Sequence, residues 1–342
     1  MMTRDRAPAV SRISGNALRD CDDTIAVQRI LCATDLTARS DNTTRRASLL
    51  AQQLKAEILF VHAVAESHAG RVLRMKIARA QAQLLTLAER AKKFGAANAD
   101  VSVSVSTPIQ AIIGAAQAWK PDIIVMARPR RQRLDPVIGT TAERVIRATH
   151  RPVLLVNARG VEPYRNVVLA TDLSKTSVQV ARIAASMGLL RDAYTWIVHA
   201  FTPPYHGLVP TDIEEQLAAH RRHWRGVLSR EVLQKLSTEG VDLSRVEVVV
   251  EAARPCDAIE QSLRNSGSEL VIIGTSRWFT LKRMLFGSVA DQVFRRMSCD
   301  ILAISARANT RQQAQQRDNA TPASLPTGLP VTTSPLGELV DS

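Results

Sequence analysis

The stretch LVIIGTSRWFTLKRMLFGSVADQVFRRMSCDILAIS, residues 270–305, decides the fold. Its apolar run from Leu270 to Ile273 predicts a buried strand that stops at Gly274. A basic loop follows, and a helix starts at Gly287 and Ser288 before a last apolar strand. A strand, a loop and a helix start together make a natural anion site, because the first helical turn has free N–H groups and a positive dipole end.

The chain between its two ends is one unit repeated twice. RILCATDLTARSDNTTRRASLLAQQL (29–54) matches NVVLATDLSKTSVQVARIAASMGLL (166–190), so Asp35 corresponds to Asp172, and further along His62 corresponds to His199. The sequence therefore predicts two domains, 27–158 and 163–306. Residues 1–26 and 307–342 lack an apolar period and are predicted to be disordered tails.

Each copy alternates short apolar strands with amphipathic helices. This alternation predicts a parallel sheet covered by helices on both faces, with ligands bound beyond the carboxyl ends of its strands. In the first copy the expected strands are 29–33, 57–62, 101–105, 122–126 and 152–156, and the expected helices are 42–53, 71–94, 109–119 and 140–148.

The composition limits the classes of function. The net charge of +13 suggests an acidic partner, yet much of it sits in three clusters: Arg128, Arg130, Arg131 and Arg133; Arg221, Arg222 and Arg225; and Arg277, Lys282 and Arg283. No nucleic-acid-binding motif accompanies them, so nucleic acid is the weakest alternative. No apolar run is long enough for a membrane span or a signal peptide, which predicts a cytoplasmic protein without a membrane partner. The four cysteines have no metal-site or redox spacing and are expected to be inert thiols.

The loop after Gly274 resembles the phosphate loop of the universal stress protein family. That loop reads Gly, two residues, Gly, nine residues, Gly, then Ser or Thr; here Gly274 and Gly287-Ser288 fit, and Arg277 stands at the second glycine. The closing segment GSVADQVFRRMSCDILAIS is similar to the family's last helix and strand. The resemblance implies an α/β fold with two tandem Rossmann-like domains of the adenine nucleotide alpha hydrolase-like kind, each a five-stranded parallel sheet.

The resemblance also implies an ATP site, with or without Mg²⁺, in the second copy. Asp172 and its neighbour Thr171 would hold the adenosine together with the backbone of Ala200, and Gly274, Arg277, Gly287, Ser288 and Val289 would hold the phosphates. Alternatives remain open at single residues. Asp172 either contacts the ligand or only forms the turn and caps the next helix, whereas for Asp35 the cap is favoured. Arg277 either bonds to phosphate or closes the pocket. His62 and His199 are expected to be structural.

The first copy departs further from the family pattern. It keeps Gly139-Thr140, but Met126 or Ala127 stands at the first glycine and Pro129 at the second. Proline has no N–H to donate, and a side chain blocks the close approach of backbone to phosphate, so this copy is expected to have lost nucleotide binding.

The predicted function is a cytoplasmic stress-response regulatory module that binds ATP in its second domain. No catalytic constellation occurs in the sequence, so an enzyme is not expected. The alternatives are a structural or interaction protein that binds no nucleotide, and nonspecific nucleic-acid binding through the arginine clusters. Family members with one copy dimerise through their last strand. The two copies are therefore expected to form an intramolecular pseudo-dimer through 152–156 and 301–304, with further homo-dimerisation and a protein partner left open.

Overall fold

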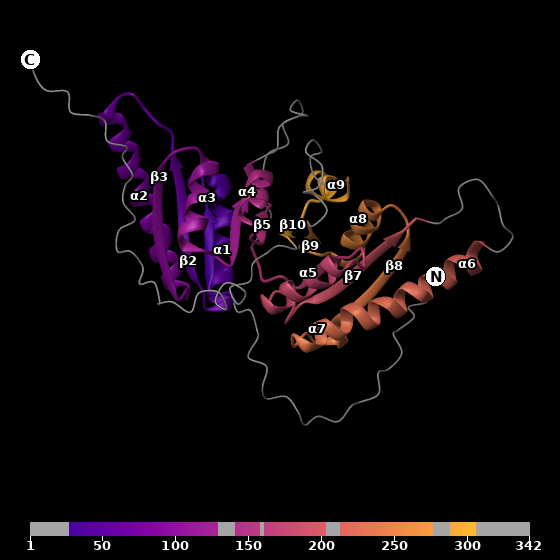
Figure 1. Ribbon diagram of the computed structural model, residues 1–342. Helices are drawn as coiled ribbons and strands as arrows, with labels where there is room; N and C mark the ends of the chain where they lie inside the picture. The colour runs from indigo at the N-terminus through magenta and orange to yellow at the C-terminus, as the bar shows by residue number, and fades with distance from the viewer. Residues whose placement is uncertain (1–26, 129–140, 158–160, 203–212, 276–287, 306–342) are drawn as a thin grey trace, which may run out of the picture.

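The first half of the chain, called domain 1, contains five strands and the helices between them in the computed structural model (Figure 1). The structure describes residues 27–128, 141–157, 161–202, 213–275 and 288–305. The elements of domain 1 are β1 (Arg29–Ala33), the 3₁₀ turn η1 (Ala38–Ser40), α1 (Asp41–Leu54), β2 (Glu57–Val64), α2 (Gly70–Lys93), β3 (Asn98–Val105), α3 (Pro108–Trp119), β4 (Ile123–Ala127), α4 (Thr141–Thr149) and β5 (Val153–Val156).

The second half, domain 2, repeats this order. One helical run interrupted by a π-turn takes the place of α2. The elements are β6 (Asn166–Ala170), α5 (Lys175–Ser186), β7 (Tyr194–Phe201), α6 (Ile213–Leu228), the π-turn η2 (Ser229–Leu233), α7 (Gln234–Thr238), the 3₁₀ turn η3 (Leu243–Arg245), β8 (Val246–Ala252), α8 (Pro255–Ser266), β9 (Leu270–Gly274), α9 (Ser288–Arg296) and β10 (Asp300–Ile304).

Local sequence signals explain where several helices begin and end. Thr107 caps α3 in a reciprocal capping box with Gln110, and Pro108 occupies the first helical position, where its missing N–H costs nothing. The helix α8 likewise begins at a proline, and it ends at Gly267, whose φ of 63° suits glycine.

All the strands join into one sheet in the order β3-β2-β1-β4-β5-β10-β9-β6-β7-β8. Pairing is parallel within each domain, and the two domains meet where β5 and β10 pair antiparallel. This pairing confirms the expected pseudo-dimer through the last strand of each copy. The outermost strands are β3 and β8, at opposite ends of the sheet (Figure 1).

Helices cover both faces of the sheet, as the alternating pattern predicts. One face packs against α1, α2, α5, α6 and α7, and the other against α3, α4, α8 and α9. Each of the two apolar cores contains buried residues from both domains, for example Leu50 with Val180 on one face and Ile112 with Ile259 on the other. The domains therefore share their cores as well as their sheet.

Candidate functional site

The carboxyl edge of the sheet in domain 2 gathers the residues expected to hold adenosine. The strands β9, β6 and β7 are neighbours, so Gly274 at the end of β9, Thr171 and Asp172 after β6, and Ala200 near the end of β7 lie along the same edge. The helix α9 begins at Ser288, and Val289 in its first turn is half-buried. Arg277 and Gly287 lie outside the described residues. Four of the expected positions thus share this edge, and α9 supplies two more at its start.

The turn after β6 is built by short-range hydrogen bonds. The Thr171 hydroxyl accepts a bond from the Leu173 N–H at 3.1 Å, and Asp172 Oδ1 accepts one from the Ser174 N–H at 3.0 Å. Leu173 adopts a φ of 60°, a left-handed conformation that side chains rarely take. The cap of α5 is Ser174, whose hydroxyl accepts from the Ser177 N–H at 3.2 Å. Asp172 therefore forms the turn, while the capping role belongs to Ser174.

The matching turn in domain 1 holds its carboxylate more firmly. Asp35 Oδ1 accepts bonds from the Thr37 N–H at 3.0 Å, the Thr37 hydroxyl at 2.7 Å and the Ser40 hydroxyl at 2.6 Å. Partial burial by itself raises the pKa of Asp35, but the donors from Ser40 and Thr37 outweigh it and hold the pKa below its usual value. Asp35 therefore forms the turn, but the expectation that it caps the next helix is wrong, because Thr37 and Ser40 occupy the N-cap positions of η1 and α1.

Both histidines at this edge tie the second strand of their domain to the first. His62 Nδ1 donates to the Thr34 carbonyl at 2.9 Å, and His199 Nδ1 donates to the Thr171 carbonyl at 3.0 Å. A carbonyl only accepts, so Nδ1 carries a proton in each ring. The predicted structural role of these residues is confirmed.

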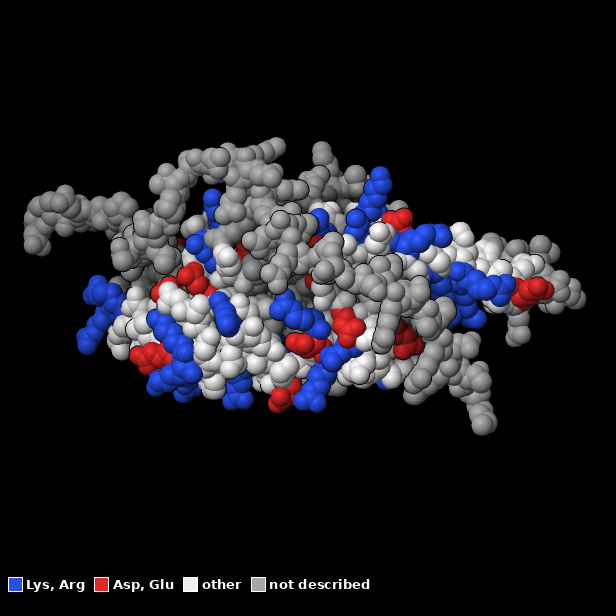
Figure 2. Space-filling model, turned by 90° about the horizontal axis from the view of Figure 1, so that it is seen from below, with Lys and Arg blue, Asp and Glu red and all other residues white. Residues whose placement is uncertain are grey.

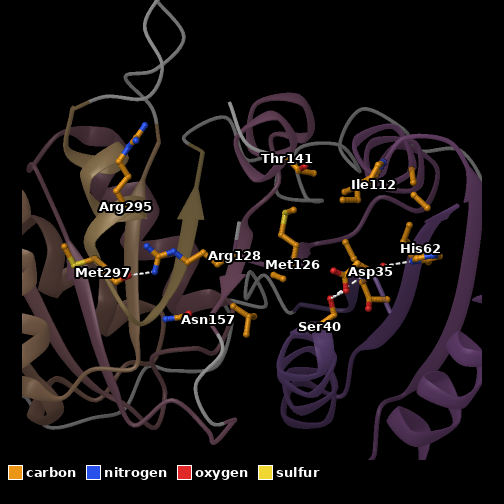
Figure 3. A pocket seen from close by; sticks show the side chains of 18 of the residues that line it. Asp35, Ser40, His62, Ile112, Met126, Arg128, Thr141, Asn157, Arg295 and Met297 are labelled. Atoms are coloured by element: carbon orange, nitrogen blue, oxygen red, sulfur yellow. Dashed lines mark hydrogen bonds between the residues drawn. The ribbon is translucent and has the colours of Figure 1, made fainter. Parts of the chain in front are cut away.

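A cavity of about 720 Å³ opens at the equivalent edge of domain 1 (Figure 3). Its wall is about equally apolar and polar, and Asp35 and His62 lie on one side of it. The apolar part of the lining that domain 1 supplies consists of Ala33, Val61, Ala63, Pro108, Ala111, Ile112, Met126, Ala127 and Val156. The sequence predicts the loss of nucleotide binding in this copy, yet the space at its sheet edge is retained.

Domain 2 completes the wall of this cavity through the end of α9. Arg295, Arg296, Met297 and Ser298 line it from across the domain junction. Both guanidinium groups are engaged in ion pairs, Arg295 with Asp291 at 2.8 Å and Arg296 with Asp257 at 2.7 Å. Sequence reasoning misses this contribution, because it depends on how two distant segments meet; the expected pseudo-dimer was the one available signal.

Arg128 connects the two domains at this wall. Its backbone N–H donates to the Val156 carbonyl at 3.0 Å, and its guanidinium donates to the carbonyls of Phe294 and Met297 at the end of α9 (Figure 3). A cation at this helix end satisfies carbonyls that lack helical partners. The sequence placed Arg128 in a basic cluster; in the structure it caps α9. Arg130, Arg131 and Arg133 lie outside the described residues.

Strand pairing fixes how the two phosphate loops correspond. Cys32 in β1 lies opposite Val125 in β4, and its counterpart Leu169 in β6 lies opposite Ile272 in β9. Counting on from these pairs places Ala127, and not Met126, at the position of Gly274.

The position of the second glycine falls in the loop beyond these strands, at 129–140 of domain 1 and 276–287 of domain 2, which lie outside the described residues. The placement of Pro129 at this position stays a prediction. The sequence alone leaves this alignment free by one residue, because both choices keep the apolar strand intact.

Gly274 has a packing reason that needs no ligand. A Cβ built on it would lie 3.2 Å from Val180 Cγ2 of α5, closer than most side-chain contacts allow. Thr275, which follows, is fully buried, and its hydroxyl has no hydrogen-bond partner among the described residues. The backbone therefore approaches α5 closely where β9 leaves the sheet.

The cysteines that the structure describes behave as buried thiols. Cys32 and Cys256 are buried and Cys299 is partly so, and burial raises the pKa of Cys299 to about 12. A thiol with such a pKa stays protonated and unreactive at neutral pH. The expectation of inert thiols is confirmed for these three; Cys21 lies outside the described residues.

The basic residues do not merge into one stripe on the face seen in Figure 2. Blue Lys and Arg side chains lie there among red Asp and Glu. On α6, Trp224 lies between the arginines of the second cluster. Its ring packs against those of His199 and His223, with ring centroids 5.1 Å apart in each pair. In the described ranges no helix is long and apolar enough to span a membrane, and no group of three His, Cys, Asp or Glu side chains could hold a metal ion.

Comparisons with known proteins agree with this architecture. The profile described as "Universal stress protein family" matches the chain twice, over residues 26–157 and 163–305. A universal stress protein of Methanocaldococcus jannaschii is 24% identical over 147 residues, which cover 42% of this chain and 84% of that protein.

Solved structures show the same fold over most of the chain. A universal stress protein from Archaeoglobus fulgidus superposes with a TM-score of 0.58 at 17% identity, covering 83% of this chain and 99% of the other. A putative universal stress protein from Pseudomonas aeruginosa gives a TM-score of 0.56 at 17% identity, with coverage of 85% and 99%. Two profile matches, one in each half of a continuous sheet, establish that the chain belongs to the universal stress protein family, with two copies of its domain in tandem.

Proposed function

We propose that the protein is a regulatory module of the stress response that binds one ATP, with or without Mg²⁺, in domain 2. The observation that carries this proposal is the gathering of Thr171, Asp172, Ala200 and Gly274 along three neighbouring strands, with a nine-residue helix beginning at Ser288. The exposed carboxylate of Asp172 suits the hydroxyl groups of a ribose.

The start of α9 supplies the phosphate side of this site. The backbone N–H groups of Gly287, Ser288 and Val289 would bind the phosphates, because the first turn of a helix has unpaired donors and a positive dipole end. Arg277 would add a charge-assisted bond to phosphate. No residue in the site is assigned a catalytic role, so the bound nucleotide acts as a signal in this proposal.

Matched substitutions in the two domains test the proposal. Nucleotide released from the purified protein is identified by mass spectrometry, and ATP is titrated calorimetrically. Ala200→Leu fills the expected adenine position, and Gly287→Val blocks the phosphate position; Ala63→Leu and Gly139→Val are the same changes in domain 1. We expect one ATP per chain, with binding weakened by about tenfold or more in the domain 2 variants and unchanged in the domain 1 variants. No binding at millimolar ATP would support the structural alternative instead.

A second candidate site is favoured by the cavity of domain 1. Its volume lies within the roughly 300–1,000 Å³ of small-molecule sites, and its wall combines apolar side chains with polar ones, including the carboxylate of Asp35. Of the three glycines in the family's loop it keeps only Gly139, so it would take a ligand that has no chain of phosphates, such as a nucleoside. Adenosine titrated into the same variants tests this site: loss of its binding through Ala63→Leu and not through Ala200→Leu would place a ligand here.

A further inference from the structure

The strand pairing that joins the domains is self-complementary. Leu154 of β5 lies opposite Leu302 of β10, and these two leucines occupy the same position in the two copies. On either side, Leu155 pairs with Ile301 and Val153 with Ala303. The repeat relates Leu155 to Ala303 and Val153 to Ile301, so a twofold rotation that exchanges the domains turns one of these pairs into the other. Two copies of domain 1, or two of domain 2, would pair in the same register. The strands themselves therefore do not decide which domains meet.

A buried polar cluster lies on one side of this junction. Arg46 of α1 and Asp300 of β10 are 3% and 7% exposed, and Arg46 Nε lies 3.2 Å from Asp300 Oδ2, as an ion pair rather than an aligned hydrogen bond. The Tyr164 hydroxyl donates to the same oxygen at 2.7 Å, and the Asn157 N–H donates to Oδ1 at 2.8 Å. The guanidinium also lies 4.0 Å from the centre of the Tyr164 ring and donates to the Glu162 carbonyl.

The twofold-related positions on the other side are apolar. The repeat places Ile183 of domain 2 at the position of Arg46, and Pro152 of domain 1 at the position of Asp300. Tyr164, two residues before β6, corresponds to Val27, two residues before β1. Ile183 and Val27 are 3% and 2% exposed. The cation, the anion and the hydroxyl are therefore present on one side of the junction and are replaced by apolar side chains on the other.

We propose that Arg46 and Asp300 specify the pairing of domain 1 with domain 2 and exclude pairing of like domains from two chains. In a pair of two domains 2, Asp300 would face Ile183 and lose its cation. In a pair of two domains 1, Arg46 would face Pro152 and Val27 without an anion. A buried charge without a partner is strongly unfavourable, whereas the mixed pair satisfies both charges. Specificity of this kind arises because the wrong pairs are destabilised: each leaves a buried charge without a counter-ion.

The test uses the folded chain cut once between its domains. A protease site replaces residues 158–160, and the chain is cleaved after folding. The noncovalent complex is diluted and incubated so that the domains can exchange partners. It is then concentrated, and the pairs are identified by native mass spectrometry. In the wild type we expect the mixed pair in about tenfold or greater excess over either like pair. In the variant Arg46→Ile/Tyr164→Phe/Asp300→Val, which makes the cluster apolar, the distribution should approach the statistical mixture of all three pairs.

Two outcomes would overturn the proposal: like pairs as abundant as the mixed pair in the cleaved wild type, or an unchanged preference for the mixed pair in the apolar variant. If the triple variant does not fold, Arg46→Met/Asp300→Leu removes the same two charges with unbranched or strand-compatible apolar side chains and gives the same readout. The matched control is Arg182→Met on α5, which removes a half-exposed guanidinium from its ion pair with Glu239, away from the domain junction, and should leave the wild-type distribution intact.

Discussion

The two Ala-Thr-Asp-Leu tetrads form the same turn at the carboxyl edge of the sheet through hydrogen bonds within the tetrad. In each, a threonine hydroxyl accepts from the leucine N–H two residues on, and the leucine, Leu36 or Leu173, is in the left-handed region with φ near 60°. Such a conformation is costly for an L-residue, so the neighbouring bonds must hold it. The turn is thus already formed before any ligand arrives.

The lowered pKa of Asp35 predicts that the stability of the protein depends on pH. The pKa of this carboxyl is lowered in the folded state, so its contribution is present above the unfolded pKa of about 3.9 and is lost as the pH falls through the lower, folded value. We expect Asp35→Asn to lower the free energy of unfolding by about 1 kcal/mol at pH 7. In urea titrations this difference should shrink below about pH 4.

The side chain of Ser40 provides the control for this prediction. Ser40→Ala removes one donor to Asp35 and should cause a smaller pH-dependent loss of the same sign. A difference between wild type and Asp35→Asn that is constant from pH 7 to pH 3 would contradict the assignment, because it would mean that the ionised carboxylate is not what the donors stabilise.

Among the elements, α9 has a function proposed at each end. Its first turn would bind the phosphates in the ATP site proposed for domain 2, and the carbonyls of Phe294 and Met297 at its last turn accept bonds from Arg128 of domain 1. The end of this helix is therefore held by the other domain. This link was not predictable from sequence, where Arg128 belongs to a basic run like any other.

Removal of the Arg128 cap should loosen α9. Charged hydrogen bonds contribute about 1.5–3 kcal/mol, so Arg128→Met should accelerate amide hydrogen exchange in Val289–Arg296 by about tenfold or more. The control is Arg222→Met on the exposed surface of α6, which should leave α9 unchanged. Equal exchange in α9 for both variants would show that the guanidinium does not hold this helix.

The elements themselves follow closely from the sequence. In domain 1 the helices and most strands begin and end within about two residues of their predicted limits, because apolar periodicity and capping residues fix them locally. The strand β3 was expected from residue 101 but starts at Asn98. Its first residues pair with β2 from Glu57 onward, and polar residues such as Asp100 give no apolar signal for such pairing.

For the whole molecule, shared cores predict a single unfolding transition. Leu154 lies at the centre of the junction and is fully buried. We expect Leu154→Ala to lower the free energy of unfolding by about 2–5 kcal/mol and to destabilise both domains together. Fluorescence of Trp119 reports on domain 1, and that of Trp196, Trp224 and Trp278 on domain 2, in variants that keep only one set.

Coincident transitions from the two sets of tryptophans are the expected result, in the wild type and in Leu154→Ala alike. Two separate transitions, with only the domain 1 signal shifted by the substitution, would contradict a shared core. A surface change such as Leu85→Ala, at a side chain that is 53% exposed, is the control and should leave both transitions within about 0.5 kcal/mol of the wild type.

The global arrangement was predictable to the level of strands and not of side chains. The repeat and the apolar last strands predict two domains that pair through 152–156 and 301–304, and the antiparallel contact of β5 and β10 confirms it. The polar cluster around Arg46 and the part of the cavity wall supplied by α9 could not be predicted. Both depend on contacts between residues more than a hundred positions apart, for which a single sequence carries no local pattern.

The continuous sheet also has a consequence for growth into fibres. Antiparallel fusion consumes one edge of each domain, so among the strands that the structure describes only β3 and β8 lie at an edge, where backbone is open to an incoming strand. These strands carry Asp100, Glu247 and Glu251. Carboxylates on the outer strand oppose the stacking of identical chains edge to edge, because each would meet its own charge. These carboxylates therefore disfavour growth of the sheet through its two outer strands.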